Sequence, residues 1–276
     1  MRLTVVGLGL LGGSFALSLR EVEPSVVVTA VDLPEVLDRP AARRAAHAFV
    51  AVNDEAAVRD SVRSADLTLL AAPVRRIVTL LPSVLGVARL VTDCGSTKRA
   101  IADAASGLPG RGRFVLGHPM AGAPEGGIEH ARAGLFRDRR WLICPAGSDP
   151  DAVGAVEELV RRLGAEPVRL DAPAHDHAVA LTSHATQLVA SALAAVALEA
   201  GADVAAGPAF DGATRVAGGP AEMWGDILST NAHDVADALA ALGRELETVR
   251  AGLAQPVPDI RAALALLARA RRLRQK

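Results

Sequence analysis

Two short polar runs follow predicted strands and carry the side chains best suited to chemistry. In the first, Gly117-His118-Pro119-Met120-Ala121-Gly122, a histidine stands at the end of the apolar run 114–116, and a proline follows it directly. An imidazole can act as a general base or accept a hydrogen bond from a substrate near neutral pH. His118 is therefore the first candidate catalytic residue.

The second run, Asp93-Cys94-Gly95-Ser96-Thr97-Lys98, joins a predicted strand over 90–92 to a predicted helix over 98–105. Its hydroxyl groups allow two interpretations. Ser96 or Thr97 could simply cap the N-terminus of that helix. Alternatively, Ser96 could belong to a site, because ligands of open α/β sheets bind beyond the carboxyl ends of the strands.

A glycine-rich run near the start of the chain predicts a dinucleotide site. The strand-like Leu3-Thr4-Val5-Val6 leads into Gly7-Leu8-Gly9-Leu10-Leu11-Gly12, and a second predicted strand over 26–31 ends at Asp32. The glycines permit a tight turn, close approach of the backbone to a pyrophosphate and close packing of the next helix. An acidic residue at the position of Asp32 binds ribose hydroxyls and repels a 2′-phosphate, which favours NAD over NADP. The predicted cofactor-binding residues are Gly7, Gly9, Leu10, Leu11, Gly12, Asp32, Ala72 and Pro73.

The elements that must position these residues alternate between strand and helix as far as about residue 170. Further strands are predicted over 66–71, 114–116, 141–144 and 168–170, and helices over 75–85 and 149–163. This alternation indicates an α/β fold with a Rossmann-type parallel sheet. From His175 onward the pattern is that of Ala- and Leu-rich helices. We predict a dinucleotide-binding domain over 1–172 and an all-helical domain for substrate binding and dimerisation over 173–276.

The composition excludes several classes of function. The 276 residues include 30 basic and 31 acidic side chains, and 3% are aromatic, so no basic or aromatic surface for nucleic acid is expected. Cys94 and Cys144 form no Cys-x-x-Cys or Cys/His cluster, so we predict no metal and a reducing, cytoplasmic location. The apolar runs 67–74 and 188–198 are shorter than the roughly 20 residues of a membrane span, so we predict no membrane partner.

Taken in order, the glycine-rich run, the run from Asp93 to Lys98 and the run from Gly117 to Gly122 resemble the prephenate/arogenate dehydrogenase family of tyrosine biosynthesis. The resemblance continues in the helical part. His175-Asp176-His177 with Ser183-His184 is similar to one segment of that family, and Phe210-Asp211-Gly212-Ala213-Thr214-Arg215 followed by Trp224 is similar to its substrate-binding segment.

The resemblance implies an NAD-dependent oxidative decarboxylation of prephenate to 4-hydroxyphenylpyruvate by a homodimer. It implies that His118 accepts a hydrogen bond from the ring hydroxyl of the substrate and that Ser96 orients both groups. It also implies that Arg215 binds a substrate carboxylate, and that His184, Gln187 and Trp224 contact the substrate. Where many relatives carry a second histidine, this chain has Gln187. An amide can donate to a keto group or accept from an amine, so arogenate is the alternative substrate.

Two other hypotheses come from different classes of protein. One is a different NAD-dependent oxidoreductase, or a relative that acts on an amino-substituted prephenate. The other is a non-catalytic NAD sensor, which the joint presence of Ser96, His118 and Arg215 disfavours.

Overall fold

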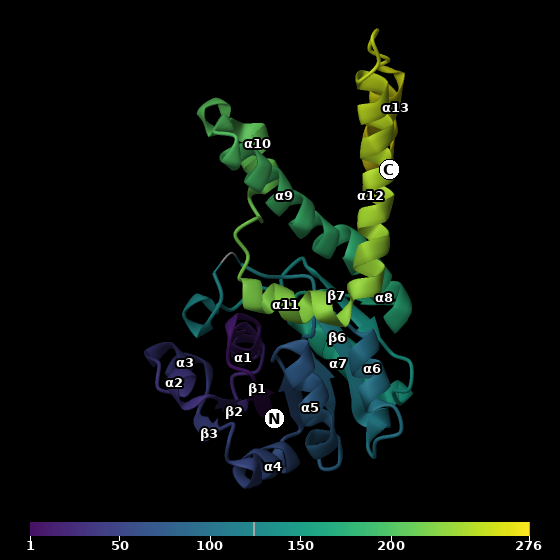
Figure 1. Ribbon diagram of the computed structural model, residues 1–276. Helices are drawn as coiled ribbons and strands as arrows, with labels where there is room; N and C mark the ends of the chain where they lie inside the picture. The colour runs from purple at the N-terminus through teal and green to yellow at the C-terminus, as the bar shows by residue number, and fades with distance from the viewer. Residues whose placement is uncertain (124, 276) are drawn as a thin grey trace.

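The computed structural model describes residues 1–123 and 125–275, and it places an eight-stranded sheet beside a set of helices (Figure 1). The strand order is β3-β2-β1-β4-β5-β6-β7-β8. The strands are β1 (Arg2–Val6), β2 (Val27–Asp32), β3 (Ala48–Ala51), β4 (Leu67–Leu70), β5 (Val91–Asp93), β6 (Phe114–Pro119), β7 (Arg140–Cys144) and β8 (Glu166–Arg169).

Helices connect most strands and then make up the rest of the chain. Up to β8 they are α1 (Leu10–Val22), α2 (Pro34–Leu37), α3 (Pro40–Ala45), α4 (Glu55–Ser64), α5 (Val74–Leu85), α6 (Arg99–Ala105) and α7 (Pro150–Arg162), with the short turns η1 (Arg111–Arg113) and η2 (Ile128–His130). After β8 they are α8 (Ala172–Val179), the π-helical turn η3 (Ala180–His184), α9 (Ala185–Glu199), η4 (Ala202–Ala205), α10 (Pro208–Thr214), α11 (Ala221–Thr230), α12 (Ala232–Leu253) and α13 (Arg261–Arg274).

The sheet is parallel except where β6 and β7 pair, an exception that the sequence pattern did not predict. Strand β7 pairs with β6 in the antiparallel sense, with Gly117 opposite Ile143 and His118 opposite Leu142. A parallel connection needs a crossover that is usually a helix. Between β6 and β7 the described residues form only the single turn η2, so the chain returns along the edge of β6 instead. The prediction of a Rossmann-type sheet followed by helices is otherwise confirmed.

Apolar side chains of the strands alternate between two cores, one on each face of the sheet. In β1, Leu3 and Val5 belong to one core and Val6 belongs to the other. Successive side chains of a strand point to opposite faces, so a sheet covered by helices on both sides buries all of them. The carboxyl ends of β1, β4 and β5 are thereby fixed side by side, where a ligand can bind.

The helices that follow β8 share only a small core of their own. Its buried members are Ala180, Ala185, Val235 and Ala238. Helices α9 and α10 extend away from the sheet in one direction, and α12 with α13 extends in another (Figure 1). Apolar side chains therefore stay exposed along these helices, among them Leu193, Val196, Leu246, Leu264 and Leu267.

One continuous helical stretch, Ala172–Glu199, is long and apolar enough to meet the length and composition of a membrane span. The sequence pattern predicted only shorter apolar runs, because it did not indicate that α8, η3 and α9 form one continuous helix. Its most apolar window has a mean hydropathy of 1.4, and a third of that window is buried in the protein. The stretch also carries His175, Asp176 and His184, which are buried in polar contacts. These buried polar contacts are those of a helix that packs against other parts of a protein.

Aspartates of the helical domain cap two helices of the sheet domain. The Asp226 carboxylate accepts hydrogen bonds from the backbone N–H groups of Val74 and Arg75 at the start of α5, at 2.6 and 3.2 Å. At α6, Asp176 accepts from Lys98 N and Arg99 N at 2.7 and 2.9 Å. Of the two interpretations of Ser96 and Thr97, local capping of α6 is therefore wrong, since Asp176 takes the place of a local cap. Thr97 instead donates its hydroxyl hydrogen to Thr230.

We expect Asp226→Ala to lower the stability of the whole chain. The substitution leaves two N–H groups of α5 without their partner, and loss of a cap costs about 1 kcal/mol. In a protein of this size that corresponds to a fall in Tm of about 2–4 °C, measured by differential scanning calorimetry. Asp103→Ala, on the exposed face of α6, is the matched control and should leave Tm within about 1 °C. Equal Tm values for the two variants would contradict the capping role.

Candidate active site

The glycine loop between β1 and α1 has the shape that a dinucleotide requires. Gly7 has a φ of +98°, and a Cβ there would lie 2.5 Å from the carbonyl oxygen of Ala71. A Cβ on Gly12 would collide with the carbonyl oxygen of Gly7, whereas a Cβ on Gly9 would meet nothing within 4 Å. The turn and the helix packing therefore need two of the glycines, and the third leaves open space beside the N-terminus of α1. A pyrophosphate fits such a place, next to unpaired backbone N–H groups.

Asp32 ends β2 beside this loop, as the sequence predicts. Its Oδ1 accepts a hydrogen bond from Leu33 N at 2.7 Å, and its Oδ2 accepts from Leu8 N. A carboxylate has about four lone-pair sites, so both oxygens keep capacity for ribose hydroxyls. The loop, α1 and Asp32 together fit NAD.

A cavity of about 1030 Å³ lies between the sheet edge and α11. Predicted cofactor residues Leu11, Ala72 and Pro73 line one part of it, and Ser96 lines another. Helix α11 contributes Met223, Asp226 and Ile227. The cavity thus joins the cofactor loop to the end of β5, where a substrate can meet a bound cofactor.

His118 stands at the end of β6, and its ring is linked to α8. Its Nδ1 lies 2.9 Å from Nε2 of His175, and the two ring centroids are 5.1 Å apart. Burial lowers the pKa of His118 well below its ordinary 6.5, and the nearby His175, Lys98 and His184 lower it further. The imidazole is therefore neutral at physiological pH and can accept a hydrogen bond.

A buried ion pair supports the peptide group just before His118. The Nζ of Lys98 donates to the Asp93 carboxylate and to the carbonyl oxygen of Gly117, the latter at 2.8 Å. Asp93 in turn accepts from the N–H groups of Gly117 and Gly95 at 3.0 and 2.8 Å. Asp93 and Lys98 are both fully buried, so each charge depends on the other. Sequence reasoning did not assign either residue to the site, although both stand in the run that contains Ser96.

The side chains of His184, Gln187 and Trp224 lie close to one another, and His184 lies near His118. The rings of His184 and Trp224 meet edge to face with centroids 6.0 Å apart. A Cβ at position 219 would touch both Trp224 Nε1 and Gln187 Nε2, so both groups lie next to Gly219. Burial lowers the pKa of His184 to about 4. Among the described residues, the buried indole nitrogen of Trp224 has no hydrogen-bond partner, which leaves an N–H donor for a ligand.

Two predicted site residues, Arg215 and Ser96, form no hydrogen bond with His118 in the described part of the chain. Arg215 follows α10, which packs on α9, and its side chain is exposed. Figure 1 shows α9 and α10 extending away from the sheet. Ser96 lines the cavity, but no hydrogen bond connects it to His118 in the part of the chain that the structure describes. The partner of His118 is His175, which sequence reasoning placed only in a family-like segment.

The remaining histidines take structural or solvent positions. His47 accepts a hydrogen bond from Val28 N, and His233 is exposed beside Asp237. Within residues 1–123 and 125–275, no group of three or more His, Cys, Asp or Glu side chains could hold a metal ion.

A Rossmann-type sheet with a dinucleotide loop, a neutral histidine at a strand end and a helical domain beside the site defines a two-domain, NAD-dependent dehydrogenase. Comparison with known proteins identifies the family. A family model described as "Prephenate dehydrogenase, nucleotide-binding domain" matches residues 15–169, and "Prephenate dehydrogenase, dimerization domain" matches residues 171–263. The chain belongs to the prephenate dehydrogenase family.

Individual relatives agree with this assignment. The chain is 30% identical to prephenate dehydrogenase of Bacillus subtilis, over 89% of this chain and 68% of that protein. It is 30% identical to cyclohexadienyl dehydrogenase of Zymomonas mobilis, over 93% and 90%. A solved structure from Corynebacterium glutamicum, described as a putative prephenate dehydrogenase, superposes with a TM-score of 0.85 at 28% identity, over 99% and 89%.

The neutral histidines predict a loss of stability in mild acid. His118, His175 and His184 have lower pKa values in the folded chain than the ordinary 6.5, so the unfolded chain takes up protons first as the pH falls. Each then removes up to about 1.4 kcal/mol of unfolding free energy per pH unit below pH ~6.5. We expect urea titrations to show this fall between about pH 7 and about pH 5.

The matched control for this experiment is His233→Gln, which replaces an exposed histidine. Its unfolding free energy should fall with the same slope as that of the unmodified chain. A free energy that stays constant over this range would show that the three rings are not held neutral.

Proposed function

We propose that this protein oxidises and decarboxylates prephenate, with NAD⁺ as the hydride acceptor, to give 4-hydroxyphenylpyruvate and CO₂. The observation that carries the proposal is the neutral, oriented imidazole of His118 at the end of β6, the strand next to β5 and Ser96. The activity of the named relatives supports it.

The chemistry needs a hydrogen-bond acceptor more than an acid. As the hydride leaves the ring carbon that carries the hydroxyl, positive charge develops on the hydroxyl oxygen. His118 stabilises this charge by accepting the O–H hydrogen bond, because its own ring is uncharged. The ring carboxylate departs as CO₂ and leaves its electron pair to complete the aromatic ring. The bound cofactor supplies the acceptor for the hydride, and no metal is needed.

Several side chains are assigned roles around this step. Ser96, at the cavity wall, orients the substrate hydroxyl. His184 and Trp224 form the pocket wall, and the free indole N–H of Trp224 suits a substrate oxygen. The guanidinium of Arg215 binds a substrate carboxylate, for which its paired donors are suited. Because α10 lies away from β6, the strand of His118, in the single chain (Figure 1), we assign this last contact to the assembled dimer.

Gln187 makes arogenate the second candidate substrate. It is buried, and its amide lies beside Gly219 together with the indole of Trp224, so we assign it as a polar partner for the substrate side chain. Such an amide can donate to the keto group of prephenate or accept from the amino group of arogenate. A site whose buried polar group is unsuited to one substrate discriminates strongly against that substrate, so the orientation of this amide decides the preference.

We further propose an NAD preference, a homodimer and a cytoplasmic location. Asp32 beside the glycine loop disfavours the 2′-phosphate of NADP. Cys94 and Cys144 are buried and free, as is usual in a reducing compartment. We also propose that the sheet domain spans 1–172 and that the helical domain spans 173–276.

Steady-state assays that follow NADH absorbance test the activity. We expect turnover of prephenate or arogenate with NAD⁺, at a higher kcat/KM than with NADP⁺. His118→Ala should lower kcat by about 10²–10⁴-fold, because the acceptor for the hydroxyl is lost. His233→Gln, at an exposed histidine, should retain full activity. Absence of turnover with both substrates would refute the proposed function, and a preference for NADP⁺ would refute the role of Asp32.

Light scattering tests the dimer. Large apolar side chains are exposed along α9, α12 and α13, and such surfaces mark sites of protein–protein contact, so we expect a mass of twice the 28.4 kDa chain at micromolar concentration. Leu267→Glu, on the exposed face of α13, should shift the mass towards that of one chain. The control is Asp103→Lys, at a solvent-exposed position on α6, which should leave the mass unchanged. A 28.4 kDa mass for the unmodified chain would exclude the dimer.

A further inference from the structure

The hydrogen bonds around His118 determine which of its ring nitrogens carries the proton. Nε2 of His175 lies 2.9 Å from Nδ1 of His118, and Nδ1 of His175 lies 2.8 Å from Oδ1 of Asp176. We propose that His175 and Asp176 are positioning residues that hold His118 in the tautomer with Nδ1 protonated, so that Nε2 is the hydrogen-bond acceptor. The inference rests on the proposed function only where it names a substrate hydroxyl as the donor to Nε2.

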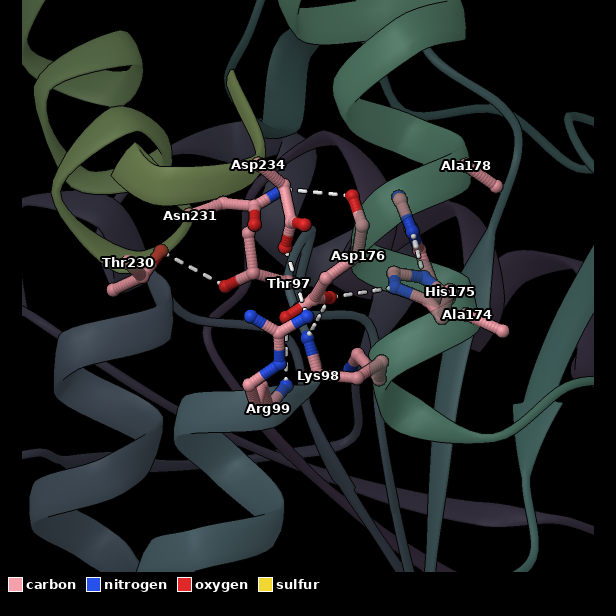
Figure 2. Close-up of polar contacts among 12 residues, drawn as sticks. Thr97, Lys98, Arg99, Ala174, His175, Asp176, Ala178, Thr230, Asn231 and Asp234 are labelled. Atoms are coloured by element: carbon pink, nitrogen blue, oxygen red, sulfur yellow. Dashed lines mark hydrogen bonds and ion pairs between the residues drawn. The ribbon is translucent and has the colours of Figure 1, made fainter. Parts of the chain in front are cut away.

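The hydrogen bonds from His118 to His175 and from His175 to Asp176 form a relay. Asp176 determines its direction, because its environment keeps Asp176 ionised as a carboxylate. Its Oδ1 also accepts from Lys98 N at 2.7 Å, and its Oδ2 accepts from Arg99 N at 2.9 Å. Figure 2 shows the carboxylate of Asp176 between the His175 ring and the first residues of α6. Burial raises the pKa of Asp176, but the hydrogen bonds from His175, Lys98 and Arg99 outweigh this and hold it below its ordinary value. An ionised carboxylate can only accept, so Nδ1 of His175 must donate.

His175 then passes the constraint to His118. Both His175 and Asp176 are fully buried, so water offers the ring no alternative partner. A neutral imidazole has one donor and one acceptor, and with Nδ1 donating to Asp176 its Nε2 must accept. The remaining hydrogen in this contact therefore comes from Nδ1 of His118. Nε2 of His118 is left with a lone pair, which is the form that can accept from a substrate.

The surrounding charges keep the relay from reversing. A second proton on His175 would place a hydrogen on its Nε2 and force His118 into the opposite tautomer. Burial disfavours that proton, and so does the buried ammonium of Lys98, although Asp176 and Asp93 favour it. The pKa of His175 is consequently lowered. On the other side of the cluster His184 is also neutral, because burial lowers its pKa to about 4.

The ring nitrogens can be observed directly by NMR of the full-length protein with ¹⁵N-labelled histidine and saturating NAD⁺. Protonated and unprotonated ring nitrogens have well-separated ¹⁵N shifts, and His118→Gln identifies the signals of His118 by their loss. We expect His118 to be protonated at Nδ1 and unprotonated at Nε2, and His175 to show the same pattern. This readout requires no turnover.

Two substitutions of His175 then separate positioning from packing. His175→Leu fills a similar space and removes the acceptor, so His118 should move towards the Nε2-protonated form that free histidine prefers. We expect kcat to fall by about 10²-fold, while KM changes by less than about threefold. His175→Gln restores an oxygen near the former Nε2, and should recover kcat to within about tenfold of the unmodified enzyme. If His175 acted only by filling space, His175→Gln would not recover both kcat and the Nδ1-protonated form of His118.

The outcomes are distinguishable. Protonation of His118 at Nε2 in the unmodified protein overturns the relay, as does an unchanged tautomer and kcat in His175→Leu. If His175→Leu does not fold, the spectrum of the unmodified protein still decides. If His118 is protonated at Nδ1 but neither prephenate nor arogenate is turned over, the relay stands and the proposed function fails.

Discussion

The carboxylate of Asp176 is the contact on which both the docking of the two domains and the state of the site depend. It belongs to α8 of the helical domain, yet it accepts the first free N–H groups of α6 in the sheet domain. The same oxygen that caps α6 also accepts from His175. Asn231, at the start of α12, donates to the backbone oxygen of Asp176 and lies beside His184. Domain docking and orientation of the imidazole pair therefore use one set of hydrogen bonds.

A second constraint on the position of His118 comes from the sheet domain, through the buried ion pair of Asp93 and Lys98. Removing two charges from water is costly, and their mutual attraction does not reliably repay it. Their hydrogen bonds to both polar groups of Gly117 give the pair a geometrical role. His118 is thus held along its backbone by the sheet domain and along its ring by the helical domain. The positive charge of Lys98 also keeps the ring neutral.

The two parts of the chain differ in how completely they bury their apolar side chains. The sheet has helices on both faces, and its cores are extensive. The helices after β8 share a core cluster with four buried apolar residues, and they leave apolar side chains exposed on α9, α12 and α13. Helices of this kind obtain most of their stability from packing. A second copy of the chain would complete that packing, which agrees with the dimerization domain of the matched family model.

The sequence by itself determined the sheet domain, the glycine loop, Asp32, and His118 as a candidate at a strand end. These features depend on local periodicity and on residues that are close in the chain, so they leave a pattern that can be read. Only the tertiary structure decided that β7 is antiparallel, that Asp176 caps α6, that His175 is the partner of His118, and that Arg215 lies apart from it. The contacts of His118 with His175 and of Lys98 with Asp176 span 57 and 78 positions. Such pairs leave no periodic pattern in the sequence, because they form only when two domains pack against each other.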